Sequence, residues 1–140
     1  MPYLLDTNIV SELRKTHPDP SVARWYATVP DDALYLSVLV IGEIHQGIER
    51  LRRRDHDQAR ALDDWLETLK STYADRIIPV TTDVAEEWGR LNVPDPLPFV
   101  DGLMAATALV HGSTLATRNT KHVERAGVRL VNPFEFDGTN

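Results

Sequence analysis

Cysteine is absent from the 140-residue sequence. Disulfide bonds and thiolate metal sites are therefore excluded. Because disulfides are rare in the cytosol, this absence agrees with a cytoplasmic protein, which is the localisation we expect.

Long apolar runs are also missing. No apolar stretch is longer than Val38 to Ile41, whereas about 20 apolar residues are needed to span a bilayer. The N-terminal segment has no basic residue before Asp6, which ends its short apolar stretch. We therefore expect neither a signal peptide nor a membrane partner.

Positive charge is in deficit, because 15 lysines and arginines stand against 21 aspartates and glutamates and the net charge is −6. Proteins that bind nucleic acid are more often basic, so this balance weighs mildly against a function on RNA. Arginines at positions 50 and 52–54 nevertheless form a compact basic run that could bind phosphates. For any one of these arginines, a solvated helix end is the slightly better explanation.

The sequence does contain an alternation of short strand-like segments with longer helical ones. It predicts strands at residues 3–5, 34–36, 77–80, 113–116 and 128–131, and helices at residues 7–15, 21–28, 38–53, 57–72, 83–91 and 99–111. This order is typical of an α/β protein with a mostly parallel sheet, and the length suits a single domain over residues 1–140.

Two local expectations concern side-chain packing. On the second predicted helix, Val22, Trp25 and Tyr26 should point inward. Gly42 and Gly47 are unusual in the interior of a helix. They indicate that another part of the chain approaches the backbone of the third predicted helix closely.

Three acidic residues and one amide occupy comparable places in this scheme. Asp6 ends the first strand, and Glu43 lies about two turns into the helix that follows the second. Asp101 lies in the first turn of a helix that leads to a later strand, and Asn119 follows that strand. Ligand sites in open α/β sheets form where the carboxyl ends of strands meet. We therefore expect these side chains to converge.

Each acid also has a simpler explanation. Asp6 could only cap the first helix, and Asp101 could only complement a helix dipole. Glu43 lies among apolar residues, where an ionised carboxylate is costly unless it is paired or bound to a metal. Taken together, the three acids predict an oxygen-rich site for a divalent cation, and the sequence is compatible with one ion or two.

Four segments resemble motifs of the PIN-domain family, and within it the VapC toxins of type II toxin–antitoxin systems. They are residues 4–11, 37–47, 98–108 and 115–119, the last followed by Gly127-Val128 and Asn132-Pro133-Phe134. The resemblance covers nearly the whole chain in the family's order. It implies an α/β/α sandwich with a mostly parallel central sheet flanked by helices.

The resemblance also implies an activity and the residues that carry it. The activity is that of a Mg²⁺- or Mn²⁺-dependent endoribonuclease, with Asp6, Glu43 and Asp101 as metal ligands. Asn119 stands where many members have a fourth aspartate, and its carbonyl oxygen brings no negative charge. The neighbouring polar residues that match family positions, and that would orient ligands, waters or substrate, are Thr7, Asn8, Thr117 and Arg118.

Partners are implied in the same way. They are an RNA substrate, a cognate VapB-like antitoxin that packs on the toxin, and a second copy of the chain in a homodimer. Promoter DNA would be bound only through the antitoxin.

Two other functions stay open at this point. A non-catalytic binding module with a degenerate metal site is motivated by Asn119 in place of an acid. A phosphatase of the haloacid-dehalogenase type is motivated by Asp6 after a strand, but that family has a second acid where Asn8 stands. The histidines lack the spacing of a zinc site, although His122, close to Asn119, could face a substrate.

Overall fold

A five-stranded sheet runs through the centre of the protein, within residues 2–138 that the computed structural model describes. Its strands are β1 (Tyr3–Leu5), β2 (Leu34–Ser37), β3 (Ile77–Ile78), β4 (Thr114–Ala116) and β5 (Leu130–Val131). They are ordered β3-β2-β1-β4-β5, and every neighbouring pair is parallel. The prediction of an α/β fold with a mostly parallel sheet is confirmed, and the sheet is in fact entirely parallel.

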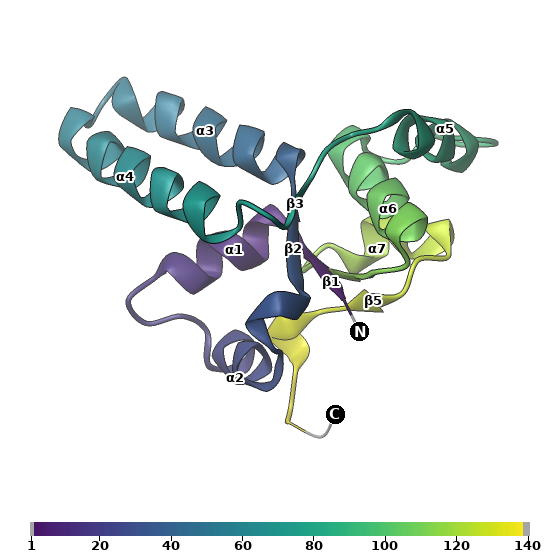
Figure 1. The fold of residues 1–140 in the computed structure, drawn as a ribbon, viewed down its shortest axis with the longest axis horizontal. Helices are drawn as coiled ribbons and strands as arrows, with labels where there is room; N and C mark the ends of the chain where they lie inside the picture. Colours follow the sequence, from purple (N-terminus) through teal and green to yellow (C-terminus); the bar gives the residue numbers. More distant parts are fainter. Residues whose placement is uncertain (1, 139–140) are drawn as a thin grey trace.

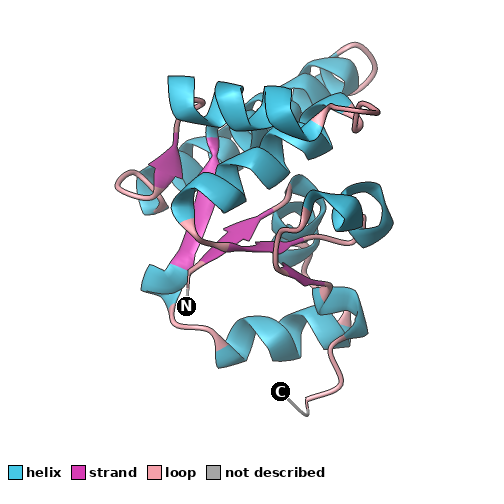
Figure 2. Cartoon of the chain, turned by 90° about the vertical axis from the view of Figure 1, so that its right-hand side faces the viewer, coloured by secondary structure: helices cyan, strands magenta, loops and turns pink. Residues whose placement is uncertain are grey.

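Helices cover both faces of this sheet. They are α1 (Thr7–Arg14), α2 (Pro20–Thr28), α3 (Val38–Arg52), α4 (His56–Thr72), α5 (Thr82–Leu91), α6 (Phe99–His111) and α7 (Thr120–Val123). Short 3₁₀ turns lie at Asp31–Ala33, Glu124–Ala126 and Pro133–Glu135. Figure 1 shows α1–α4 on one side of the strands and α5–α7 on the other. Seen from the side, the strands lie between two helical layers (Figure 2).

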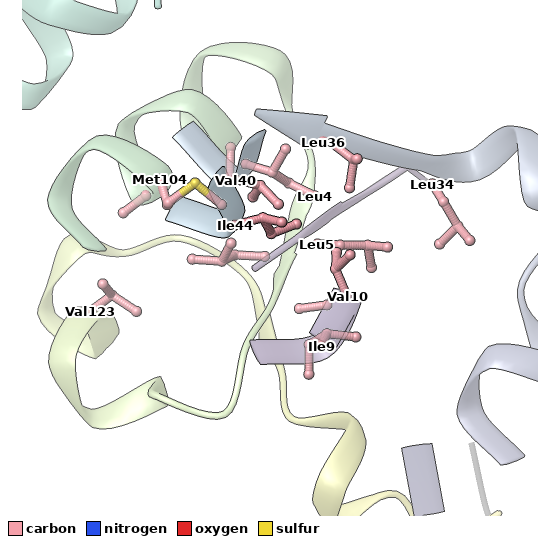
Figure 3. Packing of buried hydrophobic residues seen from close by; sticks show 14 of the residues in the cluster. Leu4, Leu5, Ile9, Val10, Leu34, Leu36, Val40, Ile44, Met104 and Val123 are labelled. Atoms are coloured by element: carbon pink, nitrogen blue, oxygen red, sulfur yellow. The ribbon is translucent and has the colours of Figure 1, made fainter. Parts of the chain in front are cut away.

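The hydrophobic core forms around β1, the central strand. Leu4 pairs with Tyr35 of β2 on one side and with Leu115 of β4 on the other. Leu4, Leu5 and Leu115 are at most 1% exposed, because a parallel strand between two helical layers is covered on both faces. Figure 3 shows the leucines of β1 and β2 packed with Ile9, Ile44 and Met104 from the surrounding helices.

Three predicted strands are shorter than expected. The fourth begins at Thr114 rather than Ser113, because its ladder with β1 starts at the Tyr3–Thr114 pair. The third ends at Ile78 rather than Val80, because its partner β2 ends at Ser37, where Ser37 pairs with Ile78 and α3 begins. The fifth begins at Leu130 rather than Val128, since its ladder with β4 starts at the Leu115–Leu130 pair.

The expectations about packing were wrong in part. Val22 and Trp25 are buried, but Tyr26 is 36% exposed and lines a hollow beside α4. A Cβ atom at Gly42 or Gly47 would meet nothing within 4 Å, so these glycines mark no close approach.

The close approach occurs at Gly102 instead. A Cβ atom there would lie 3.3 Å from Cβ of Leu97 and 3.4 Å from the Trp88 ring. The absence of a side chain at Gly102 thus lets the first turn of α6 approach α5 and the segment before α6. Asp101, the residue before this glycine, is positioned by that packing.

No helix within residues 2–138 has the length and apolar composition that crossing a membrane requires.

Candidate active site

Asp6 lies at the carboxyl end of β1, the middle strand of the sheet. Its backbone N–H donates to the carbonyl oxygen of Ala116 at 2.9 Å, which extends the contact between β1 and β4 by one residue. Its Oδ1 atom accepts the backbone N–H of Thr7 at 2.8 Å and caps α1. The capping role considered for Asp6 is therefore present, and it leaves the second carboxylate oxygen for other contacts.

That second oxygen, Oδ2, receives two side-chain donors. The hydroxyl of Thr117, which follows β4, donates to it at 2.6 Å, and Nδ2 of Asn8 donates at 3.3 Å. Asn8 in turn accepts the backbone N–H of Arg118 at 3.3 Å. The loops after β1 and β4 are thus tied together around one buried carboxylate.

Glu43 reaches the same edge of the sheet from α3. The helix begins directly after β2, where the hydroxyl of Ser37 accepts the backbone N–H of Leu39 at 3.0 Å. The hydroxyl of Thr7 donates to Oε1 of Glu43 across the gap between α1 and α3. Thr7 therefore links the helix that Asp6 caps to the second acid.

Asp101 comes from the opposite helical layer, in the first turn of α6. Its carboxylate is 18% exposed, and its Oδ2 atom lies 2.8 Å from Nδ1 of His122 on α7. α6 begins after Pro98, whose ring offers no side-chain cap. The position of this acid consequently depends on α6 packing and on His122.

The electrostatics of Asp6 reflect its surroundings. Burial raises the pKa of its carboxyl above the usual value, and the negative charges of Asp101 and Glu43 raise it further. The hydrogen bonds from Thr117 and from the Thr7 backbone oppose this rise without cancelling it. The structure thus brings Glu43 and Asp101 near enough to Asp6 for their charges to raise its pKa, and Asp6 is the most buried of the three acids.

The donor set suits a hydrated magnesium ion better than a fully enclosed metal. Within residues 2–138, no three carboxylate or imidazole groups are close enough to form one compact ligand cluster. Magnesium keeps several of its waters and needs only one or two direct carboxylates, so more widely spaced acids are compatible with it. A divalent cation would also offset the repulsion that raises the pKa of Asp6.

Asn119 and Arg118 are placed differently from the acids. Asn119 joins the network through its backbone N–H, which donates to the Thr117 hydroxyl at 3.0 Å. The Arg118 guanidinium lies over the ring of Phe134, 4.2 Å from its centroid, and its charge helps to lower the pKa of Glu12. The Arg118 side chain is exposed in this stacked position, so a substrate phosphate could reach it there.

The basic run at the end of α3 is partly occupied. Arg52 forms ion pairs with Glu49 at 3.1 Å and with Asp63 of α4 at 2.8 Å. Arg50, Arg53 and Arg54 are exposed. One of the four arginines thus holds two helices together, which leaves three for any contact with phosphate.

Sequence reasoning missed the contact between His122 and Asp101. The four-residue helix α7 was not predicted, and without it the histidine could not be placed. The only signal in the sequence was that His122 stands three residues after Asn119, at helical spacing.

Comparison with known proteins identifies the family. The sequence model of the family described as the PIN domain matches residues 3–128 of this chain. The chain belongs to the PIN domain family. The PIN domain accounts for nearly all of the described fold and includes every predicted site residue from Asp6 to Asn119.

Two relatives of this PIN domain and one solved structure match along almost their whole length. The VapC ribonuclease Y4jK of Sinorhizobium fredii is 34% identical over 94% of this chain and 97% of its own. The toxin FitB of Neisseria gonorrhoeae is 30% identical over 94% of this chain and 97% of its own. The crystal structure of FitAcB from Neisseria gonorrhoeae superposes with a TM-score of 0.88 at 29% identity, covering 96% of this chain and 99% of that one.

Proposed function

We propose that this PIN domain is the toxin of a type II toxin–antitoxin pair and acts as an endoribonuclease that requires Mg²⁺ or Mn²⁺. The observation that carries the proposal is the buried Asp6 carboxylate, whose pKa is raised by burial and by the charges of Asp101 and Glu43. A relative named a ribonuclease and another named a toxin, both matched over nearly the whole chain, support it.

Each site residue has a proposed role. Asp6, Glu43 and Asp101 would hold the ion, and the Asn119 carbonyl could add a neutral ligand. Asn8, Thr7 and Thr117 keep the carboxylates oriented through the hydrogen bonds described above. Arg118 would bind a phosphate of the RNA. When bound, the metal polarises the scissile phosphodiester and lowers the pKa of an attacking water.

We extend the proposal to the partners and the setting. A cognate VapB-like antitoxin would inhibit the toxin and would carry it to promoter DNA, and two toxin chains would form a homodimer. The protein would work in the cytoplasm as a single domain over residues 1–140.

The test is RNA cleavage by the purified chain. Cleavage of a structured RNA should require Mg²⁺ or Mn²⁺ and should stop in EDTA. Asp6→Asn and Asp101→Asn should each lower the rate at least about a hundredfold, because each removes a charge from the donor set. Asp64→Asn, at an exposed aspartate of α4, is the matched control and should cleave like the wild type.

Normal cleavage by Asp6→Asn and Asp101→Asn would show that the proposed ligands are wrong. Metal-independent RNA binding without any cleavage would favour the non-catalytic binding module instead. Growth arrest on expression in a bacterial host, relieved by the gene of the neighbouring antitoxin, would test the toxin role separately.

A further inference from the structure

The segment that follows β4 supplies hydrogen-bond donors to two of the three acids. Thr117, at its start, donates to Asp6 at 2.6 Å, and His122, five residues later, lies 2.8 Å from Asp101. The third acid, Glu43, has its donor in Thr7. Each acid therefore has a side-chain partner of its own, and His122 is the one that no role yet explains.

We propose that His122 is a positioning residue, which holds the Asp101 carboxylate toward Asp6 and so sets the affinity of the site for a divalent cation. This inference rests on the proposed function, because it assigns His122 a role toward the metal that the three acids would bind. The role is that of an N–H donor to the acid, and it requires no change in the charge of the imidazole.

Asp101 needs such a partner for two reasons. Among the described residues, His122 is the only side chain that hydrogen-bonds its carboxylate. The charge of Asp101 also repels that of Asp6, so a carboxylate free to rotate would turn away from the other acids. The bond to His122 engages Oδ2, and no donor within residues 2–138 reaches Oδ1.

His122 is well placed to act as a fixed support. Its backbone N–H donates to the carbonyl oxygen of Asn119 at 3.0 Å. The next residue, Val123, is 1% exposed and anchors α7 in the core. Thr117 fixes the start of the same segment by accepting the backbone N–H of Asn119. The segment after β4 thus orients two proposed metal ligands, Asp6 and Asp101. The same segment contains Asn119, where many family members have a fourth acid.

An exposed hydrogen bond without function is the alternative. The His122 side chain is 53% exposed, and pairs of this kind usually contribute little to stability. Stability measurements alone would therefore not separate the two explanations, whereas metal affinity does.

The experiment measures Mn²⁺ binding by isothermal titration calorimetry, without RNA, on the full chain and three variants. His122→Ala should weaken Mn²⁺ binding about tenfold, the usual effect of losing a group that orients a metal ligand. His122→Asn keeps an N–H donor and should stay within about threefold of the wild type. His111→Ala removes a histidine at the far end of α6 and should bind like the wild type.

RNA cleavage provides the second readout. At limiting Mn²⁺, His122→Ala should lower kcat with little change in KM for RNA, and excess Mn²⁺ should restore most of the rate. Melting temperatures in EDTA should agree among the four proteins, which excludes a folding defect.

The outcomes separate this inference from the proposed function. If the wild type binds Mn²⁺ and cleaves RNA while His122→Ala does both equally well, the inference is overturned and the proposed function stands. If His122→Asn is as weak as His122→Ala, the N–H donor is not what matters and the inference is again overturned. If the wild type binds no Mn²⁺, both ideas fail.

Discussion

At the scale of single residues, Asp6 caps α1 and is also a proposed metal ligand, and the two roles have opposing physical requirements. As the cap of α1 it can be either Asp or Asn, because both side chains accept backbone N–H groups. As a buried acid it raises the free energy of the folded state whenever it is ionised, since burial and its acidic neighbours raise its pKa. Stability and the proposed metal binding would therefore favour different residues at this position.

This conflict predicts a pH dependence for Asp6→Asn. Because the pKa of Asp6 is raised in the folded state, the wild type loses stability as the pH rises through that value, whereas the asparagine variant has no such loss. In EDTA, the unfolding free energy of Asp6→Asn relative to the wild type should thus increase from acid to neutral pH. Urea unfolding followed by circular dichroism at several pH values measures the trend.

Manganese provides the control for this prediction. At about a hundred times its Kd, a ligand adds about 2.7 kcal/mol to the stability of the protein that binds it. The gain should appear in the wild type and be largely lost in Asp6→Asn. A relative stability that falls with pH would mean that the hydrogen bonds from Thr117 and Thr7 outweigh the burial of the charge.

At the scale of secondary-structure elements, the connection between α1 and α2 depends on one buried acid. Glu12 of α1 accepts Nζ of Lys15 at 2.9 Å and the backbone N–H of Asp19 at 2.8 Å. Asp19 in turn caps α2 by accepting the backbone N–H groups of Ser21 and Val22. The end of one helix is thus joined to the start of the next through two carboxylates.

We predict that Glu12→Ala lowers the unfolding free energy by about 1–3 kcal/mol, because it leaves the Asp19 N–H without its partner. Lys15→Ala should cost less than about 1 kcal/mol, since the lysine is 55% exposed. The hydrogen bonds from Lys15 and Asp19 lower the pKa of Glu12, so its contribution is complete at neutral pH and is lost as the pH falls through the lowered value.

Chemical denaturation at pH 7 and at acid pH tests this prediction. The difference between the wild type and Glu12→Gln should shrink in acid, where Glu12 is protonated. A difference that does not change with pH would mean that the charge of Glu12 contributes nothing to stability and that only the shape of its side chain matters.

Most elements could be predicted because their signals are local. Ser37 caps α3, Gly112 ends α6 in a left-handed conformation, and apolar periodicity marks the helices between such signals. The ends of β3 and β5 could not be predicted in this way, because a strand ends where its neighbour does. α7 was missed because four residues are too few to show a periodic pattern.

At the scale of the whole molecule, the site follows from topology. The parallel order of the strands places Asp6 and Thr117 at the same edge, and the helices that flank the sheet bring Glu43 and Asp101 to it from opposite sides. The approach of the acids could therefore be predicted from their positions after strands. The contacts of Thr7 with Glu43 and of His122 with Asp101 could not be predicted, because they join residues 36 and 21 positions apart in the chain.

The three tryptophans allow a test of whether residues 1–140 form a single domain. Trp25, Trp65 and Trp88 belong to α2, α4 and α5, which lie in different parts of the molecule (Figure 1). All three pack in or against one continuous hydrophobic cluster. A chain with one core should unfold in one cooperative step, so the three local environments should be lost together.

Variants that keep one tryptophan each, with phenylalanine at the other two positions, make the measurement. The urea midpoint of each fluorescence transition should coincide with the midpoint from far-ultraviolet circular dichroism of the same variant. An earlier transition at Trp88 would show that α5 and α6, which pack closely on each other, unfold apart from the sheet. Because α6 carries Asp101, such local unfolding would also remove one acid from the site while Asp6 and Glu43 stayed folded.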